Sequence, residues 1–587
     1  MHLEKKNLAI VLLVVLLTAS GIGNIVLLIF GGFFSHYEKV TCVIGYPNDP
    51  FSIDPVDTWD GLSHGIEQQV VEGLVEYDTS SHPNYFVKPK LAESWHWHSN
   101  TKISFKIRED VFFHDGTSLD ADAVKWNFER LVYFCNASGT LPANQSEALA
   151  SSLYYLNNGT LLFNHFEVPS KYNFTIYLNS QFNALLDLLT FTATYICSPS
   201  STPIDRYIDI ASEKLVGTGP FKYINYKRYS EVRLERWERY WRTNPYFEEV
   251  VFKITGDPIS RMNAMLGGQF DYMGRAILPS FIDIFNSSTN IHVEEVGESL
   301  SYNYIEFYCG PGDPADNHSY DYQTLNATWR KALSLAINYS YIKQEIGQGT
   351  LSNGIPAIPR AMSAHNSSII LPDYWQDIYG YEAAVEWARE IIKSMFPTET
   401  TLLDSTFPGT TESGWKALSL RTIELNEIFE SGVGFALNLV FEQSWELIGV
   451  DVHKTIRTFG EYLETGEDSP WEMEVSVISW TPDYLDAFNM LNPLFNINST
   501  ACFSRINDTY LTNLLLDASK EFDSNLRDEI CKEIQSYIFN LNFDNPVTLT
   551  HAPLPTSIVY NVHKTDLKGI LYNVLEISSI YHWYIEI

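Results

Sequence analysis

The sequence lacks the short motifs that identify common classes of enzyme. It contains no G-x-S-x-G nucleophile turn, no H-E-x-x-H zinc site and no glycine-rich phosphate-binding loop. It also shows no internal repeat, and no low-complexity run beyond its apolar N-terminal segment. These absences weigh against an extracellular hydrolase, such as a peptidase or glycosidase, which is the alternative class of function for this chain.

Basic residues are scarce. Lys and Arg number 39 against 72 Asp and Glu, which gives a formal net charge of -33 at pH 7. Nucleic-acid binding depends on clustered Lys and Arg that release counterions from phosphates, so this balance excludes nucleic acid as a partner. An acidic surface does not repel cationic or zwitterionic ligands.

Cysteine is infrequent, and its spacing carries no metal signature. No C-x-x-C pair occurs, so we expect neither a thiolate metal site nor any other cofactor. The even number of cysteines permits disulfides outside the cell but leaves fifteen possible pairings. The six cysteines are Cys42, Cys135, Cys197, Cys309, Cys502 and Cys531.

One long stretch without charge lies at the N-terminus, at residues 8–34. It exceeds the roughly 20 residues that a membrane-spanning helix needs, and it is longer than the apolar core of a cleaved signal peptide. Lys5 and Lys6 favour a cytoplasmic N-terminus. We predict a single-pass anchor in the cell membrane with the chain from about His36 onward outside the cell. Cleavage near residues 18–21 is the alternative.

Asn-x-Ser/Thr sequences are frequent, which fits an exterior location and predicts a glycoprotein. They begin at Asn136, Asn144, Asn158, Asn173, Asn286, Asn317, Asn326, Asn338, Asn366, Asn498 and Asn507.

The remaining chain is typical of an ordered α/β protein. Its 587 residues are 45% hydrophobic and 14% aromatic, enough for roughly two or three lobes with separate cores. Residues 39–46 and 102–109 have the composition of strands, and residues 118–134 have the periodicity of a helix. Before that helix, Gly116 permits a turn, and Asp120 or Asp122 suits the helix start.

Several motifs in a fixed order resemble the solute-binding proteins of ABC importers, in the branch that takes up peptides, nickel chelates and some oligosaccharides. The most specific match is "VKPKLAESW" followed by "ISFKIREDVFFHDGTSLDADAVKWNFERL", residues 87–131. The resemblance runs from about Val40 to the C-terminus. Its other motifs are "SIDPVDTWDGLSHGIEQQVVEGLVEYD" (52–78), "GTGPFKYINYKRYSEVRLERWERYW" (217–241), "WRKALSLAINYSYI" (329–342) and "LIGVDVHKTIRTFGEYLE" (447–464).

This resemblance implies an α/β, two-lobed, periplasmic-binding-protein-like fold of class II, with an extra small α+β domain in the N-terminal lobe. The lobes of such a protein close on the ligand about crossing strands, here expected at residues 301–309 and 551–561. The implied division is an anchor at 8–34, the N-terminal lobe at 40–72, 196–300 and 551–587, the small domain at 73–195, and the C-terminal lobe at 301–550.

The resemblance also assigns a ligand site to the stretch "ISWTPDYLDAF". In peptide-binding relatives a Trp-x-x-Asp at this place receives the ligand's α-ammonium, and the match falls on Trp480 and Asp483. A carboxylate only accepts hydrogen bonds, so it suits an ammonium with three donors. Ser479 and Thr481 complete the expected site. The alternative is that Asp483 only starts the next helix, a role that fits Asp486 better because Asp486 is expected to point outward.

Ligand-binding residues in the opposite lobe are placed by analogy at Tyr46 and Asn48, after the first strand. A receptor for a ligand carboxylate is not identified, although Arg330, Arg360 and Arg457 qualify by charge alone.

Two histidine pairs imitate functional sites. His96 and His98 alternate on one strand face as two metal ligands would, but no third ligand is near in sequence. His114 and Asp115 resemble a catalytic pair, but no nucleophile accompanies them.

We therefore expect a membrane-anchored binding protein, not an enzyme. It would capture dipeptides or oligopeptides between its lobes and deliver them to an ABC import permease. An oligosaccharide or a metal chelate is the alternative ligand.

Overall fold

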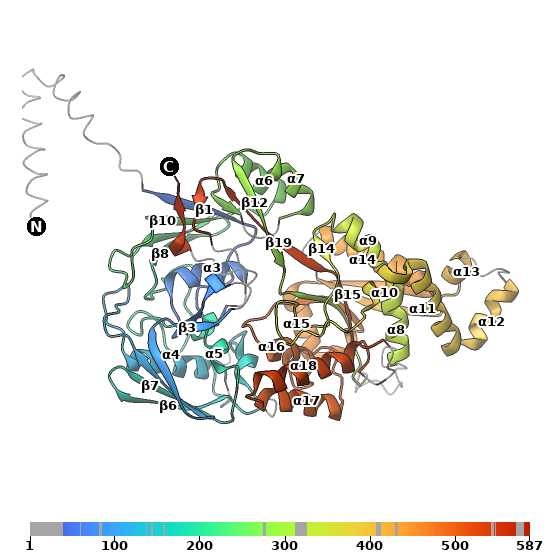
Figure 1. The fold of residues 1–587 in the computed structure, drawn as a ribbon, viewed down its shortest axis with the longest axis horizontal. Helices are drawn as coiled ribbons and strands as arrows, with labels where there is room; N and C mark the ends of the chain where they lie inside the picture. Colours follow the sequence, from blue (N-terminus) through green and yellow to red (C-terminus); the bar gives the residue numbers. More distant parts are fainter. Residues whose placement is uncertain are drawn as a thin grey trace, which may run out of the picture.

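The computed structural model contains two lobes that lie side by side and are joined by extended strands (Figure 1). The predicted anchor at residues 8–34 lies outside the described residues. Within the described part of the chain, no helix has both the length and the apolar composition needed to cross a membrane. The structure describes residues 39–586 except 59, 82–84, 137, 143–144, 157–158, 274–276, 312–325, 407–411, 429–431, 500, 542–544, 546 and 571–579.

An eight-stranded sheet forms the core of the N-terminal lobe, in the order β12-β19-β11-β1-β10-β9-β8, with β14 paired to β19. The strand predicted at residues 39–46 is β1, and its side chains Cys42 and Ile44 are fully buried. β1 runs parallel to β10 and antiparallel pairing continues to β8. The strands are β1 (Thr41–Tyr46), β8 (Phe221–Lys227), β9 (Glu231–Arg236), β10 (Glu249–Ile254), β11 (Tyr272–Met273), β12 (Ile291–Glu298), β14 (Leu351–Ser352) and β19 (Thr556–Lys564).

A smaller unit, the small domain, is built on a four-stranded antiparallel sheet in the order β4-β5-β7-β6. Helix α4 (Ala121–Phe134) packs on this sheet through Phe128, whose ring lies 5.2 Å from that of Phe174 and 5.8 Å from that of Phe163. The strands are β4 (Ala92–Ser99), β5 (Lys102–Ile107), β6 (Phe163–Ser170) and β7 (Asn173–Leu178).

The turn before α4 forms as its residues predict. Gly116 has φ +92, a backbone conformation that favours glycine, and the amide of Thr117 donates to Asp115 Oδ1 at 2.9 Å. Asp120 caps the helix by accepting from the amide of Ala123 at 3.0 Å.

The C-terminal lobe is built on a five-stranded sheet in the order β16-β15-β17-β13-β18. β15 runs parallel to both β16 and β17, so these three strands end at the same edge of the sheet. The sheet is buried through side chains such as Leu425 and Val475, which are both 0% exposed. The strands are β13 (Tyr302–Phe307), β15 (Arg421–Ile428), β16 (Val450–Arg457), β17 (Val475–Trp480) and β18 (His551–Pro553).

Short connections join the two sheets. The chain leaves the sheet of the N-terminal lobe between β12 and β13 and returns to it between β18 and β19, and the short strand β14 of the intervening segment also pairs with β19. The connections lie together, because Leu554 donates its amide to the carbonyl of Asn303 at 2.8 Å and Ser299 donates to the carbonyl of Ser557 at 2.8 Å. These connections fall at the segments expected to form the hinge, and their bending stays a prediction.

Helices cover both sheets and line the boundary between the lobes, where α5, α16 and α18 are near neighbours (Figure 1). The longer helices are α3 (Gly61–Val70), α6 (Pro258–Leu266), α7 (Pro279–Asn286), α8 (Ala327–Ala336), α10 (Pro372–Tyr379), α11 (Tyr381–Met395), α12 (Pro397–Thr406), α14 (Gly432–Glu446), α15 (Phe459–Asp468), α16 (Ala487–Phe495), α17 (Thr509–Lys520) and α18 (Ser524–Phe539). Short elements are α5 (Leu185–Leu188), α9 (Tyr339–Tyr341), α13 (Glu412–Lys416), β2 (Val75–Tyr77), β3 (Val87–Pro89), β20 (Leu567–Lys568) and β21 (Tyr584–Ile585).

All six cysteines are buried, and no disulfide joins any two of them in the described structure. Burial raises the pKa of the Cys135 and Cys502 thiols to about 12, which keeps them protonated and unreactive at neutral pH.

The predicted glycosylation sequences differ in accessibility. Asn173, Asn286 and Asn507 are exposed. Asn366 is 9% exposed, and its side-chain Nδ2 donates to Ser536 Oγ at 2.9 Å. A glycan at Asn366 would require this bond to break, so the exposed sequences are the better acceptors.

Candidate functional site

The predicted site lies where β17 ends, at the edge shared by the parallel strands of the C-terminal lobe. Trp480 is the last residue of β17 and is half-buried. Asp483 follows in the loop before α16 and is also half-buried. The carboxyl edge of parallel strands is where ligands commonly bind in α/β folds.

Asn489, on the first turn of α16, holds both residues. The indole Nε1 of Trp480 donates to the carbonyl of Asn489 at 3.0 Å. The side-chain amide of Asn489 donates to Asp483 Oδ2 at 3.2 Å, and its Oδ1 accepts from the amide of Asp483 at 2.7 Å. The Trp-x-x-Asp segment is therefore fixed by one buried residue that sequence reasoning missed.

The two hydroxyl residues of the predicted site are exposed on the same strand end. Ser479 pairs with Asn303 of β13, and Thr481 Oγ1 lies 2.7 Å from Ser301 Oγ. The hydroxyl of Thr481 thus faces the connection that joins the two lobes.

Asp486, and not Asp483, starts α16 by accepting from the amide of Phe488 at 2.8 Å, so the alternative role considered for Asp483 falls to Asp486. The expectation that Asp486 points outward is wrong. Its side chain is 9% exposed and forms an ion pair with Arg527 of α18. Burial alone would lower the pKa of Arg527, but the adjacent Asp486 raises it above its ordinary value. The ion pair satisfies both buried charges.

The small domain of the N-terminal lobe contacts this segment directly. The amide of Leu485 donates to Tyr77 Oη at 2.8 Å, and Tyr77 Oη donates to Asp187 Oδ1 at 3.0 Å. Nearby, the rings of Phe182 and Phe488 meet edge to face with centroids 6.0 Å apart. The two lobes therefore touch beside the predicted site.

The charge of Asp483 also affects the pKa of Tyr154, a side chain of the small domain. Burial, followed by the charges of Cys135 and Asp483, raises the pKa of Tyr154 well above its ordinary value. Tyr154 is 0% exposed, and its hydroxyl is buried without a hydrogen-bond partner. Tyr154 is thus a neutral side chain close to the predicted ammonium site.

Tyr46 and Asn48 lie in the other lobe, at the end of β1 and in the turn after it. Tyr46 is 8% exposed and packs edge to face against Phe252, with the centroids 5.8 Å apart. Asn48 is exposed. Their role in binding stays a prediction.

The three arginines that qualified as carboxylate receptors by charge all have partners within the protein. Arg330 is 0% exposed and donates to the carbonyl of Thr548 at 3.0 Å, and Arg360 pairs with Glu298 at 2.7 Å. Arg457 ends β16 and donates to Asn426 Oδ1 at 3.0 Å.

The two histidine pairs that imitate a catalytic pair and a metal site do not have the surroundings of such sites. Burial lowers the pKa of His114 to about 4, and its Nε2 lies 2.9 Å from the carbonyl of Gly219. The neutral His114 ring therefore links the motif at residues 87–131 to the motif at residues 217–241. His96 and His98 are exposed on β4. Among the described residues, no group of three or more His, Cys, Asp or Glu could hold a metal ion.

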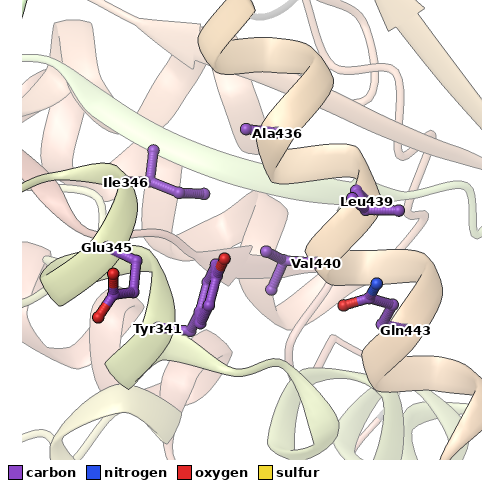
Figure 2. A pocket seen from close by; sticks show the side chains of 7 residues that line it. All are labelled: Tyr341, Glu345, Ile346, Ala436, Leu439, Val440 and Gln443. Carbon is purple, nitrogen blue, oxygen red and sulfur yellow. The ribbon is translucent and has the colours of Figure 1, made fainter.

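A pocket of about 390 Å³ lies elsewhere, on the C-terminal lobe between α14 and the turn that follows α9 (Figure 2). Its wall is mainly apolar, with Glu345 and Gln443 at opposite sides. None of the predicted site residues lines it. Its lining residues are Tyr341, Glu345, Ile346, Ala436, Leu439, Val440 and Gln443.

Comparison with known proteins gives a family and a fold. Residues 87–501 match the family model described as bacterial extracellular solute-binding proteins, family 5, middle. The chain is 23% identical over 555 residues to the peptide transport periplasmic protein SapA of Salmonella typhimurium, covering 91% of this chain and 89% of SapA.

Two solved structures share the fold. One is the periplasmic binding protein DppA of Helicobacter pylori in complex with the peptide STSA, with a TM-score of 0.73 and 18% identity over 93% of this chain and 98% of that one. The other is NikA of Brucella suis in complex with Fe(III)-EDTA, with a TM-score of 0.72 and 18% identity over 93% of this chain and 100% of that one. The predicted two-lobed, periplasmic-binding-protein-like α/β fold is confirmed.

Proposed function

This chain belongs to the bacterial extracellular solute-binding proteins of family 5, and from that premise we propose that it captures peptides between its two lobes outside the cell and delivers them to the permease of an ABC importer. One observation carries the choice of a peptide. The Asp483 carboxylate stands beside Trp480, held by Asn489, where the small domain meets the C-terminal lobe.

The chemistry of Asp483 suits the α-ammonium of a peptide. A carboxylate and an ammonium form a short, charge-assisted hydrogen bond that strengthens as water leaves the site. Trp480 offers a flat apolar surface to the peptide beside that ammonium. Ser479 and Thr481, exposed at the same strand end, supply hydroxyl groups for the peptide backbone.

Tyr46 and Asn48 are proposed to contact the ligand from the N-terminal lobe, because Tyr46 ends β1 and Asn48 lies in the turn after it. Closure of the lobes about the connections between the two sheets would bring these residues toward Asp483.

A metal chelate or an oligosaccharide is the second candidate ligand. The structural likeness to NikA, which was solved with Fe(III)-EDTA, is of similar extent to the likeness to DppA. A chelate or sugar has no α-ammonium, so its binding would not depend on the charge of Asp483. An enzyme is not proposed, because the family consists of binding proteins and the neutral His114 is engaged with Gly219.

Membrane anchoring is part of the proposal. The uncharged stretch at residues 8–34 is long enough to span a bilayer and would keep the binding protein close to its permease.

Thermal unfolding against a ligand panel tests the function. The protein is heated with di- to octapeptides, oligosaccharides or metal chelates. A ligand that binds only the folded state stabilises it by about 2.7 kcal/mol at a hundredfold excess over its dissociation constant. We expect peptides to raise the temperature of the unfolding transition, and N-acetylated peptides to raise that temperature less. A shift with sugars or chelates alone would contradict the proposal.

A further inference from the structure

The contacts of Asn489 are unusual in that one side chain satisfies both the backbone and the carboxylate of Asp483. Asn489 is 1% exposed and lies in the first turn of α16. Its Oδ1 accepts from the Asp483 amide at 2.7 Å, and its Nδ2 donates to Asp483 Oδ2 at 3.2 Å. If the side-chain amide of Asn489 were flipped, its NH₂ group would face the N–H of Asp483 and its oxygen would face the Asp483 carboxylate. Only the orientation described lets both hydrogen bonds form.

A neutral amide is the appropriate group for this position. It donates a hydrogen bond to the carboxylate and adds no opposite charge beside it. A Lys or Arg would neutralise Asp483 and compete with a cationic ligand, whereas an acidic residue would repel it. Asn489 therefore orients Asp483 through a side chain that brings no positive charge of its own.

The element that carries Asn489 is itself fixed. Asp486 caps α16 through the amide of Phe488 and pairs with Arg527 of α18. Trp480 donates to the carbonyl of Asn489 at 3.0 Å. The indole, the carboxylate and the start of α16 thus form one unit with Asn489 at its centre.

We propose that Asn489 is a positioning residue for ligand recognition: its amide sets the Asp483 carboxylate toward the α-ammonium of a peptide and so determines discrimination against ligands without that ammonium. This inference rests on the proposed function.

The test compares apparent affinities of the full-length chain for a tetrapeptide library with free N-termini and for the same library N-acetylated. Wild type is expected to favour the free library by about tenfold or more, the value of one buried charge-assisted bond. Asn489→Ala should reduce that preference by about fivefold, since one hydrogen bond to a charged group is lost. Its affinity for the acetylated library should change by less than about twofold.

Two controls separate positioning from stability. Asn496 is 7% exposed at the other end of α16, and Asn496→Ala should leave the preference unchanged. In an Asp483→Asn background, Asn489→Ala should have no further effect on the preference, because the two residues act as one unit.

Asn489→Asp gives an independent readout if the alanine variant does not fold. Its carboxylate can still accept from the Asp483 amide, but the two adjacent carboxylates must share a proton. Binding of the free library should then release a proton, and its affinity relative to wild type should rise between about pH 5.5 and 7.5.

The outcomes are distinct. If wild type shows no preference for free N-termini, the proposed function fails and this inference fails with it. If wild type shows the preference but Asn489→Ala keeps it, or lowers both affinities equally, the inference alone is overturned. An Asn489→Asp profile parallel to that of wild type would also overturn it.

Discussion

At the scale of single residues, glycines decide how closely two segments of the N-terminal lobe approach. A Cβ on Gly217 would lie 2.2 Å from the carbonyl oxygen of Val70, and one on Gly219 would lie 2.5 Å from that of Gln69. The backbone of the Gly-Thr-Gly-Pro-Phe motif therefore lies directly against the end of α3. His114 joins the same contact through the carbonyl of Gly219.

We predict that Gly217→Ala lowers the free energy of unfolding by about 1–3 kcal/mol, because the new methyl group forces the backbone apart. Urea denaturation measures this change. The matched control is Gly256→Ala, where the nearest atom to a new Cβ is the carbonyl oxygen of Pro47 at 3.6 Å. The control should change stability by less than about 1 kcal/mol. Equal losses in both variants would contradict the packing argument.

Sequence reasoning succeeds at this scale where the determinant is local. The turn at Gly116 and the cap at Asp120 depend on neighbouring residues and follow from the sequence. The outward direction expected for Asp486 is wrong, because its partner Arg527 is 41 residues later in the chain. A pattern of nearby residues carries no signal for such a partner.

At the scale of elements, α5 of the small domain meets the start of α16 in the C-terminal lobe. Burial, and then the charge of Asp486, raises the pKa of Asp187 in α5 from 3.8 to about 7. The other charged or titratable groups around it are Tyr77, which donates to its carboxylate, Arg527 and Tyr484. Contact between the lobes thus places an ionisable carboxylate beside another acid.

This contact predicts that ligand binding depends on pH. The pKa of Asp187 is raised when the lobes touch, so the touching form takes up a proton relative to separated lobes. Between about pH 5 and pH 7, where an ordinary carboxylate such as that of Asp483 stays ionised, peptide affinity should fall as the pH rises, and it should be level above about pH 7. Titration calorimetry at several pH values measures it.

Asp187→Asn tests the assignment, because asparagine can still accept from Tyr77 but does not titrate. Between about pH 5 and pH 7, the peptide affinity of Asp187→Asn should vary less with pH than that of wild type. Asp209→Asn, at a carboxylate hydrogen-bonded within its own exposed turn, is the control and should retain the wild-type profile. An unchanged profile in Asp187→Asn would show that another group is responsible.

At the scale of the whole molecule, the lobes are joined at the paired connections between the sheets and touch again beside Asp483. The contact includes Gln181 donating to the carbonyl of Lys520 at 2.7 Å and Asn183 donating to the carbonyl of Glu521 at 2.9 Å. Two points of contact around an enclosed ligand would explain how binding is coupled to lobe closure.

Hydrogen exchange can follow this closure at the amide of Leu485, which donates to Tyr77 across the lobes at 2.8 Å. We predict that a bound peptide slows exchange in the segment containing Leu485, because separated lobes leave that amide in water. Tyr77→Phe removes the acceptor and should abolish the slowing. Segments in the core of β15 should exchange equally with and without peptide, and slowing throughout the protein would contradict a local closure.

The overall architecture follows from the sequence more completely than the site does. The order of the motifs identifies the two-lobed fold because each motif forms a local turn, strand or helix. The contact between Tyr77 and Leu485 spans 408 residues, and the link between Asp483 and Asn489 depends on the direction of one buried side chain. Tertiary packing alone creates such contacts.

The role of Asp483 as receptor of a peptide ammonium is tested by the affinity of Asp483→Asn for peptides with free and with acetylated N-termini. We predict that wild type binds the free peptides more tightly and that Asp483→Asn loses about tenfold or more of that affinity, with little change for acetylated peptides. Asp517→Asn, at an exposed carboxylate on α17, should behave as wild type. Undiminished binding of free peptides by Asp483→Asn would show that Asp483 does not receive the peptide ammonium.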